Sequence, residues 1–177
     1  GPGVAQEANA AFARGAAVVP LMRTAGASAG MFDFPKLALE KPCFATEEQW
    51  SLLKRKDAPL DESAAAAVAV VKAACAGESS EARPVNEEVI RLRRVFGRDA
   101  CIVCILGGAS FHGAESEELV KELASRLESA SGPKVKFLTG GMAGVQETFA
   151  KHCGDGSRVW NLLPISQSSG YGRGTDI

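Results

Sequence analysis

The order of the predicted elements is the feature that most constrains the fold. Residues 101–106 are a short apolar run followed by Gly107 and Gly108, which is typical of the first strand and first glycine turn of a nucleotide-binding α/β domain. The chain nevertheless opens with Gly1, Pro2 and Gly3 and a helix-like run over 4–14, as though a strand had just ended. The sequence therefore predicts that the end of a domain precedes its beginning.

The second half of the chain alternates short apolar runs with helical segments. Runs of this length separated by helices favour a parallel sheet that is covered on both faces. The predicted fold class is α/β, with a doubly wound parallel Rossmann-like sheet. Strands are expected over 100–106, 134–138 and 158–163, helices over 114–130 and 143–152, and a glycine-rich tail thereafter.

The first half predicts a helix over 4–14, a strand over 16–21 and further helices from 46 and over 61–77. Polar residues with Gly and Pro over 77–84 indicate a surface linker, and an amphipathic basic helix is expected over 86–96. With 177 residues, the chain fits one domain of ordinary size. We expect residues 1–76 and 85–177 to build that domain together, joined by the linker.

Charge and hydropathy exclude two classes of partner. The net charge is −1, from 20 basic and 21 acidic side chains, so nothing electrostatic favours nucleic acid or an anionic membrane. No stretch reaches the roughly 18 apolar residues that span a bilayer. We expect a soluble protein that binds neither.

The cysteines indicate a compartment. Five of them, mostly inside apolar runs, do not form the framework of a small secreted domain. This favours a reducing, intracellular compartment such as the cytosol or an organelle stroma. Cys101 and Cys104 spell CxxC, but they lie within a predicted strand and no second pair exists. His112 and His152 have no metal-ligand spacing, so neither a metal site nor a cofactor is expected.

Two glycine-rich loops follow predicted strands and precede predicted helices. Backbone amides in such loops can point at an anion, and the missing side chains let a phosphate approach. If consecutive strands are adjacent, both loops open at the same sheet edge and could share one phosphate. Packing alone would also explain glycines at these turns. The candidate residues are Gly107, Gly108 and Ser110 in the first loop and Gly140, Gly141 and Gly144 in the second.

These motifs resemble a known family. The second half of the chain resembles the first half of the LONELY GUY family and its relatives once labelled lysine decarboxylases, including molybdenum-cofactor carrier-like proteins. The resemblance lies in the order strand, GGAS, helix, strand, TGGMAGVQETFA, helix and a strand ending before Pro164. The opening GPGVAQE, with the helix and the run AVVPL after it, is similar to that family's second half, which contains Pro-Gly-Gly-x-Gly-Thr-x-x-Glu. The resemblance implies a circularly permuted chain or parts of two tandem repeats.

The resemblance also implies roles for residues at the start of the chain. Gly1, Gly3 and Glu7 match two glycines and the glutamate of the motif, whereas Val4 replaces its threonine. In the family, this glutamate is implicated in cleaving the N-glycosidic bond of a nucleoside 5'-monophosphate, as in cytokinin riboside phosphates. Read from the residues alone, Glu7 is equally an acid favoured in a helix's first turn. The family's catalytic arginine has no aligned counterpart in this chain. Arg173 in the glycine-rich tail is the cation nearest to the expected site.

The resemblance further implies that an interior strand is missing. The family's fourth strand lies beside its first, and this chain lacks it. We expect a gap beside residues 100–106, or a strand from elsewhere that fills it. That strand could belong to a longer product, another polypeptide or the next copy of a tandem repeat. Because relatives are commonly homodimers, a homo-oligomer or a complementing chain is the expected partner.

Two functions follow from the sequence. The first is binding of a nucleotide or other phosphate ligand, with Glu7 assisting N-glycosidic hydrolysis as in a phosphoribohydrolase. The second is a non-catalytic carrier or structural subunit that uses the same fold in a larger assembly.

Overall fold

Four parallel strands form one sheet in this computed structural model, which describes residues 2–77, 94–97 and 99–177. Their order in the sheet follows their order in the chain, and each strand pairs in parallel with the next. Helices flank the sheet, so the predicted α/β class is confirmed. The strands are β1 (Cys101–Cys104), β2 (Val135–Thr139), β3 (Val159–Asn161) and β4 (Thr175–Asp176).

The helices lie close to their predicted positions. Thr46 starts the second one with a capping box, since its side chain accepts from the Gln49 amide while the Gln49 side chain accepts from the Thr46 amide. Three short 3-10 helices, η1 (Met22–Thr24), η2 (Gly26–Ala29) and η3 (Lys36–Leu39), connect the first helix to the second. The α-helices are α1 (Pro2–Ala13), α2 (Glu47–Lys54), α3 (Leu60–Gly77), α5 (Ser116–Ala130) and α6 (Val145–His152).

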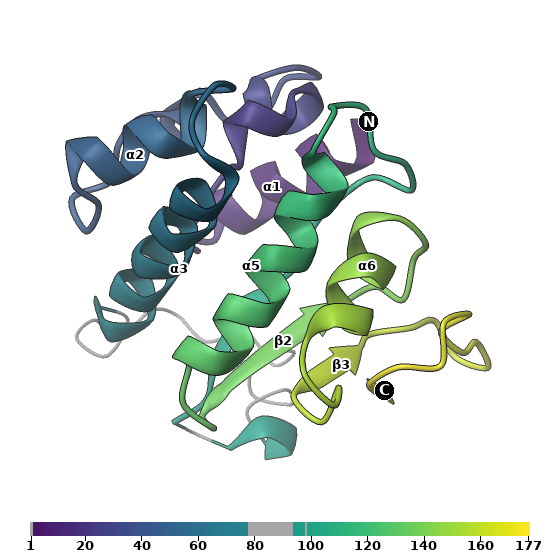
Figure 1. Ribbon diagram of the computed structural model, residues 1–177. Coiled ribbons are helices and arrows are strands. Elements are labelled where there is room, and N and C mark those ends of the chain that lie inside the picture. Colours follow the sequence, from purple (N-terminus) through teal and green to yellow (C-terminus); the bar gives the residue numbers. More distant parts are fainter. Residues whose placement is uncertain (1, 78–93, 98) are drawn as a thin grey trace.

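The α5 and α6 helices connect β1 to β2 and β2 to β3, and both cover the same face of the sheet (Figure 1). Buried apolar side chains from these elements form the main core, in which Phe137 of β2 meets Phe149 of α6 edge to face at 5.3 Å between ring centroids. On β3, Trp160 packs in the same geometry against Phe96, at 5.0 Å.

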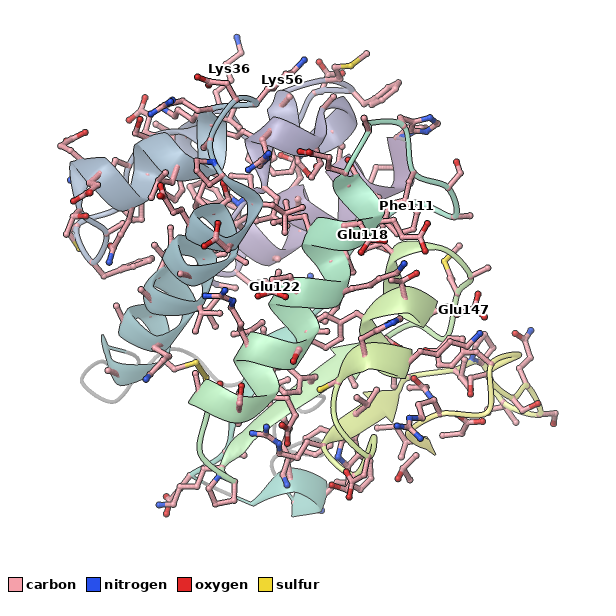
Figure 2. All side chains as sticks on the ribbon, in the orientation of Figure 1. Lys36, Lys56, Phe111, Glu118, Glu122 and Glu147 are labelled. Carbon is pink, nitrogen blue, oxygen red and sulfur yellow. A yellow bond between two sulfur atoms is a disulfide. The ribbon has the colours of Figure 1, made fainter. Side chains whose placement is uncertain are left out.

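The α3 helix ties the first half of the chain to the second. It packs beside α5, as Figure 1 shows, and α2 packs on α3 around the buried Trp50 and Leu53. A disulfide joins Cys75 of α3 to Cys101 at the start of β1 (Figure 2). The sequence analysis did not foresee this bond. Of the five cysteines, Cys43, Cys104 and Cys153 are free.

Two predicted segments differ in the structure. The expected strand over 16–21 is wrong, because this segment has no regular secondary structure and pairs with no strand. The glycine-rich tail, in contrast, ends in the short strand β4, whose backbone pairs with Trp160 and Asn161 of β3. A strand needs a neighbour for its backbone hydrogen bonds, and only the tail finds one.

Part of the predicted organisation falls outside the described residues. This applies to positions 78–84 of the linker and to 86–93 of the predicted basic helix, of which only 94–96 are described as helical. Across the described helices, none is both long and apolar enough to cross a membrane.

Breaking the disulfide should destabilise the protein. A bond that closes a 26-residue separation contributes about 3 kcal/mol by restricting the unfolded chain. We therefore expect the double variant C75S/C101S to melt well below the parent, and dithiothreitol to lower the melting temperature of the parent but not of the variant. Differential scanning calorimetry of both proteins, with the exposed C43S as control, measures this. Equal melting temperatures in parent and double variant would contradict the expectation.

Candidate functional site

A cavity of about 340 Å³ lies along β1, and every residue from Cys101 to Gly108 contributes to its wall. Its other walls come from α1, residues 16–21 and apolar side chains of α3 and α5. Gly107, Gly108, Ser110 and His112, which follow β1, line it as well. The first glycine loop therefore opens onto this cavity.

The two glycine loops pack directly on each other. A Cβ on Gly107 would lie 2.3 Å from the Cβ of Val145, and a Cβ on Gly144 would lie 2.5 Å from the carbonyl carbon of Ala109. Gly144 also has φ +80°, and the Val145 amide donates to the Gly108 carbonyl at 3.1 Å. Packing thus requires glycine at positions 107 and 144. This is the alternative to phosphate binding that the sequence left open for these glycines.

Gly108 has no such packing reason. Its φ is not positive, and a Cβ there would meet only backbone atoms of Ser110, at 3.5 Å or more. Within the described residues, the backbone N–H groups of 107–110 have no hydrogen-bond acceptor, and Ser110 is exposed. Open amides beside a glycine that packing does not need are typical of an anion-binding loop. Figure 2 labels Phe111, which follows this loop, and Glu118 in the first turn of α5.

The second glycine loop is closed by the protein itself. The Gly140 and Met142 amides donate to Oε1 of the buried Gln146, at 2.8 and 3.2 Å, and the Gly141 amide donates to Thr139 Oγ1 at 3.1 Å. Neither Gly140 nor Gly141 lines the cavity. A phosphate at this loop would have to displace the Gln146 carboxamide. The sequence analysis missed Gln146, although an amide in the first turn after a glycine loop could have suggested it.

A buried polar network anchors the tail below this loop. Asn161 is fully buried; its Oδ1 accepts from the hydroxyls of Thr139 and Tyr171, and its Nδ2 donates to Asp176 at 2.8 Å. Hydrogen bonds from Asn161 and Ser169 lower the pKa of Asp176. Because the partners of Asn161 satisfy one another, we assign the network a structural role: it holds β4 against β3.

Glu7 lies on α1, which borders the cavity, but Glu7 is not one of the residues that line it. Desolvation by the surrounding protein raises the pKa of the Cys104 thiol on β1, and the charge of Glu7 raises it further. The thiol remains exposed on its open side. Glu7 is itself exposed, and Gly3 has no atom within 4 Å of where a Cβ would stand. Gly1 lies outside the described residues.

Two arginines are engaged by the protein itself, and neither lines the cavity. Arg173, the cation that the sequence singled out, donates to the Gly154 carbonyl at 2.5 Å and packs on Gly156. Arg23, which the sequence analysis passed over, has a side chain only 6% exposed; it donates to Ser63 Oγ and pairs with Glu115 at 3.3 Å. Within the described part of the chain, no group of three or more His, Cys, Asp or Glu side chains could hold a metal ion.

The loop contact makes Gly144 sensitive to substitution. Gly144→Ala would force a methyl group against the Ala109 backbone and strain a positive φ, so we expect a loss of about 2 kcal/mol or more in unfolding free energy. Gly132→Ala, where a Cβ would have no neighbour within 4 Å, should change stability by about 0.5 kcal/mol or less. Urea denaturation of both variants checks this. Equal stabilities would mean that the two loops do not touch.

Comparison with known proteins adds no relative. No family model matches the chain, and neither a curated protein nor a solved structure is similar to it.

Proposed function

We propose that this chain binds a phosphate-bearing ligand of the nucleoside 5'-monophosphate class at the loop 107–110. The observation that supports this most strongly is Gly108, whose missing side chain serves neither packing nor backbone conformation. Beside it, four successive backbone amides lack acceptors in the described structure, and the Ser110 hydroxyl adds a further donor.

The position of the loop agrees with the proposal. In open parallel sheets, ligands bind outside the carboxyl ends of the strands, and this loop directly follows the carboxyl end of β1. The acids at the start of α5 weaken the attraction for an anion, and Lys121 offsets two of them through ion pairs with Glu117 and Glu118, at 3.1 and 2.7 Å. We therefore expect backbone amides to supply most of the affinity.

Turnover of the nucleotide is the enzymatic form of this proposal. Glu7 stands on the helix that borders the same cavity, and its carboxylate is free of ion pairs among the described residues. A carboxylate there could stabilise the positive charge that develops on the ribose as the N-glycosidic bond breaks. The family resemblance implies this role for Glu7, whereas the phosphate role of the loop glycines is inferred from the residues themselves.

A second candidate function is that of a non-catalytic subunit that joins another chain. The cavity along β1 favours it, because the strand offers an open edge. The two functions are compatible, since a ligand at 107–110 and a partner along 101–106 occupy successive stretches of the chain.

Gly108→Ala should weaken nucleotide binding without harming the fold. The added methyl group has room in the free protein but occupies the approach to the loop amides. We expect isothermal titration calorimetry with AMP to show about tenfold weaker binding or more, equivalent to about 1.4 kcal/mol. Gly132→Ala serves as the matched control and should bind like the parent. Equal affinities for Gly108→Ala and the parent would place the ligand elsewhere, and no heat from AMP or inorganic phosphate would remove the proposal.

Glu7→Gln tests turnover separately from binding. If Glu7 assists glycosidic cleavage, the variant should release adenine from AMP about a hundredfold more slowly or worse, because the amide cannot stabilise positive charge. Its affinity for AMP should stay near that of the parent. Gln6→Ala, an exposed change on the same helix, is the control. Chromatographic detection of free adenine gives the rate, and undiminished release by Glu7→Gln would exclude the role.

A further inference from the structure

The outer edge of β1 is unpaired. The Cys101 and Ile105 amides donate to the carbonyls of Lys134 and Leu138, at 3.1 and 2.8 Å, so odd-numbered residues face β2. In a parallel ladder the N–H and C=O of a residue point to the same neighbour, and therefore those of Ile102 and Cys104 face away from β2. In the described structure these four groups have no hydrogen-bond partner.

The strand also lacks the burial of its neighbour. None of the four residues of β1 is buried, whereas the last three of β2 are. The open side of β1 borders the cavity, whose lining is mainly Ala, Val, Leu, Ile and Phe. Backbone groups that face an apolar hollow without partners are costly, and proteins fill or cover such edges.

The segment 16–21, which borders the same cavity, also has backbone N–H groups without acceptors. Ala17, Val18, Val19 and Leu21 donate no backbone hydrogen bond within the described residues, and Pro20 has no N–H to donate. No hydrogen bond joins this segment to β1. Two stretches of backbone with unused N–H donors thus border one apolar cavity, and a single β-strand between them could accept from both.

We propose that β1 accepts a strand from a different polypeptide, which runs parallel to β1 and fills this cavity. The inference rests on the assembly role offered above and specifies its partner. The donated segment is extended and carries apolar, mainly β-branched side chains on both faces, since strands buried on both faces have this composition. Its parallel direction continues the all-parallel sheet.

Among its described residues, a second copy of this chain has no unused strand to donate. The described apolar runs of strand length are already placed: three of them form β1, β2 and β3, and the fourth, over 16–21, lines the cavity. To donate one, a copy would have to dismantle its own sheet or withdraw 16–21 from the wall of its own cavity. The partner is therefore another protein that exposes an apolar segment, and it binds by adding a strand to an open sheet edge.

Amide exchange of β1 tests the proposal directly. The probe is a synthetic peptide, Val-Ile-Val-Ala-Val-Val flanked by lysine pairs, compared with the same peptide N-methylated at alternate residues to remove backbone donors. We expect the first peptide to slow exchange at Ile102 and Cys104 about tenfold or more by NMR. Cys101 and Ile105, already bonded to β2, serve as internal references. Failure of the first peptide to slow exchange, or equal slowing by both peptides, would overturn the proposal.

Ile102→Pro provides a variant of the acceptor. Proline removes one cavity-facing donor and leaves the groups that face β2 intact, so peptide binding should fall while the Ile105 amide stays protected. Should this variant not fold, the N-methylated peptide still tests the same bond from the other side. A nitroxide on the amino end of the peptide should broaden resonances near Cys101; broadening near Gly108 instead would overturn the parallel direction.

Two further outcomes separate the alternatives. Analytical ultracentrifugation should find the chain monomeric without peptide; a dimer with slow exchange at Ile102 and Cys104 would assign the edge to a second copy and overturn the choice of partner. The AMP titration of Gly108→Ala measures binding at the loop that follows β1 and does not depend on the edge of β1. A failed peptide test together with intact AMP binding would thus refute the strand and leave the nucleotide site standing.

Discussion

The backbone ladder between β1 and β2 is the interaction on which the rest of the structure depends. It sets the two strands in parallel register, so that both end at the same edge of the sheet. The loops that follow are then forced into contact, with Gly144 against Ala109 and Gly107 against Val145. The α5 and α6 helices must cross the same face, where their apolar sides close the core.

The same ladder explains why the two glycine loops differ in the backbone amides that they leave open to a phosphate. Six glycine and serine positions had equal claims in the sequence, because a phosphate loop and a tight packing turn use the same residues. Contact decides between them: packing requires Gly107 and Gly144, and Gln146 occupies the amides around Gly140 and Gly141. Gly108 and Ser110 remain, with open amides beside the cavity.

The open edge of β1 indicates what kind of ligand the apolar cavity accepts. A hollow of this size could take a small molecule, but its walls include backbone that lacks partners. Unpaired peptide groups require donors and acceptors at the spacing of a strand, which a compact apolar ligand does not offer. The proposed nucleotide loop and the proposed strand site are neighbours along β1, so filling the edge would also complete one wall next to the loop.

The sequence by itself determined the α/β class, the positions of α3, α5 and α6, and the strand that precedes each glycine loop, because hydrophobic periodicity and turn residues act over short distances. It could not determine the pairing of Cys75 with Cys101, the closure of the second loop by Gln146 or the network around Asn161. The disulfide and the Asn161 network join residues far apart in the chain. The closure of the second loop depends on where the fold places the Gln146 side chain relative to the loop amides. The segment 16–21 shows the limit most clearly: its composition is that of a strand, but a strand exists only where another backbone pairs with it, and tertiary structure alone decides that.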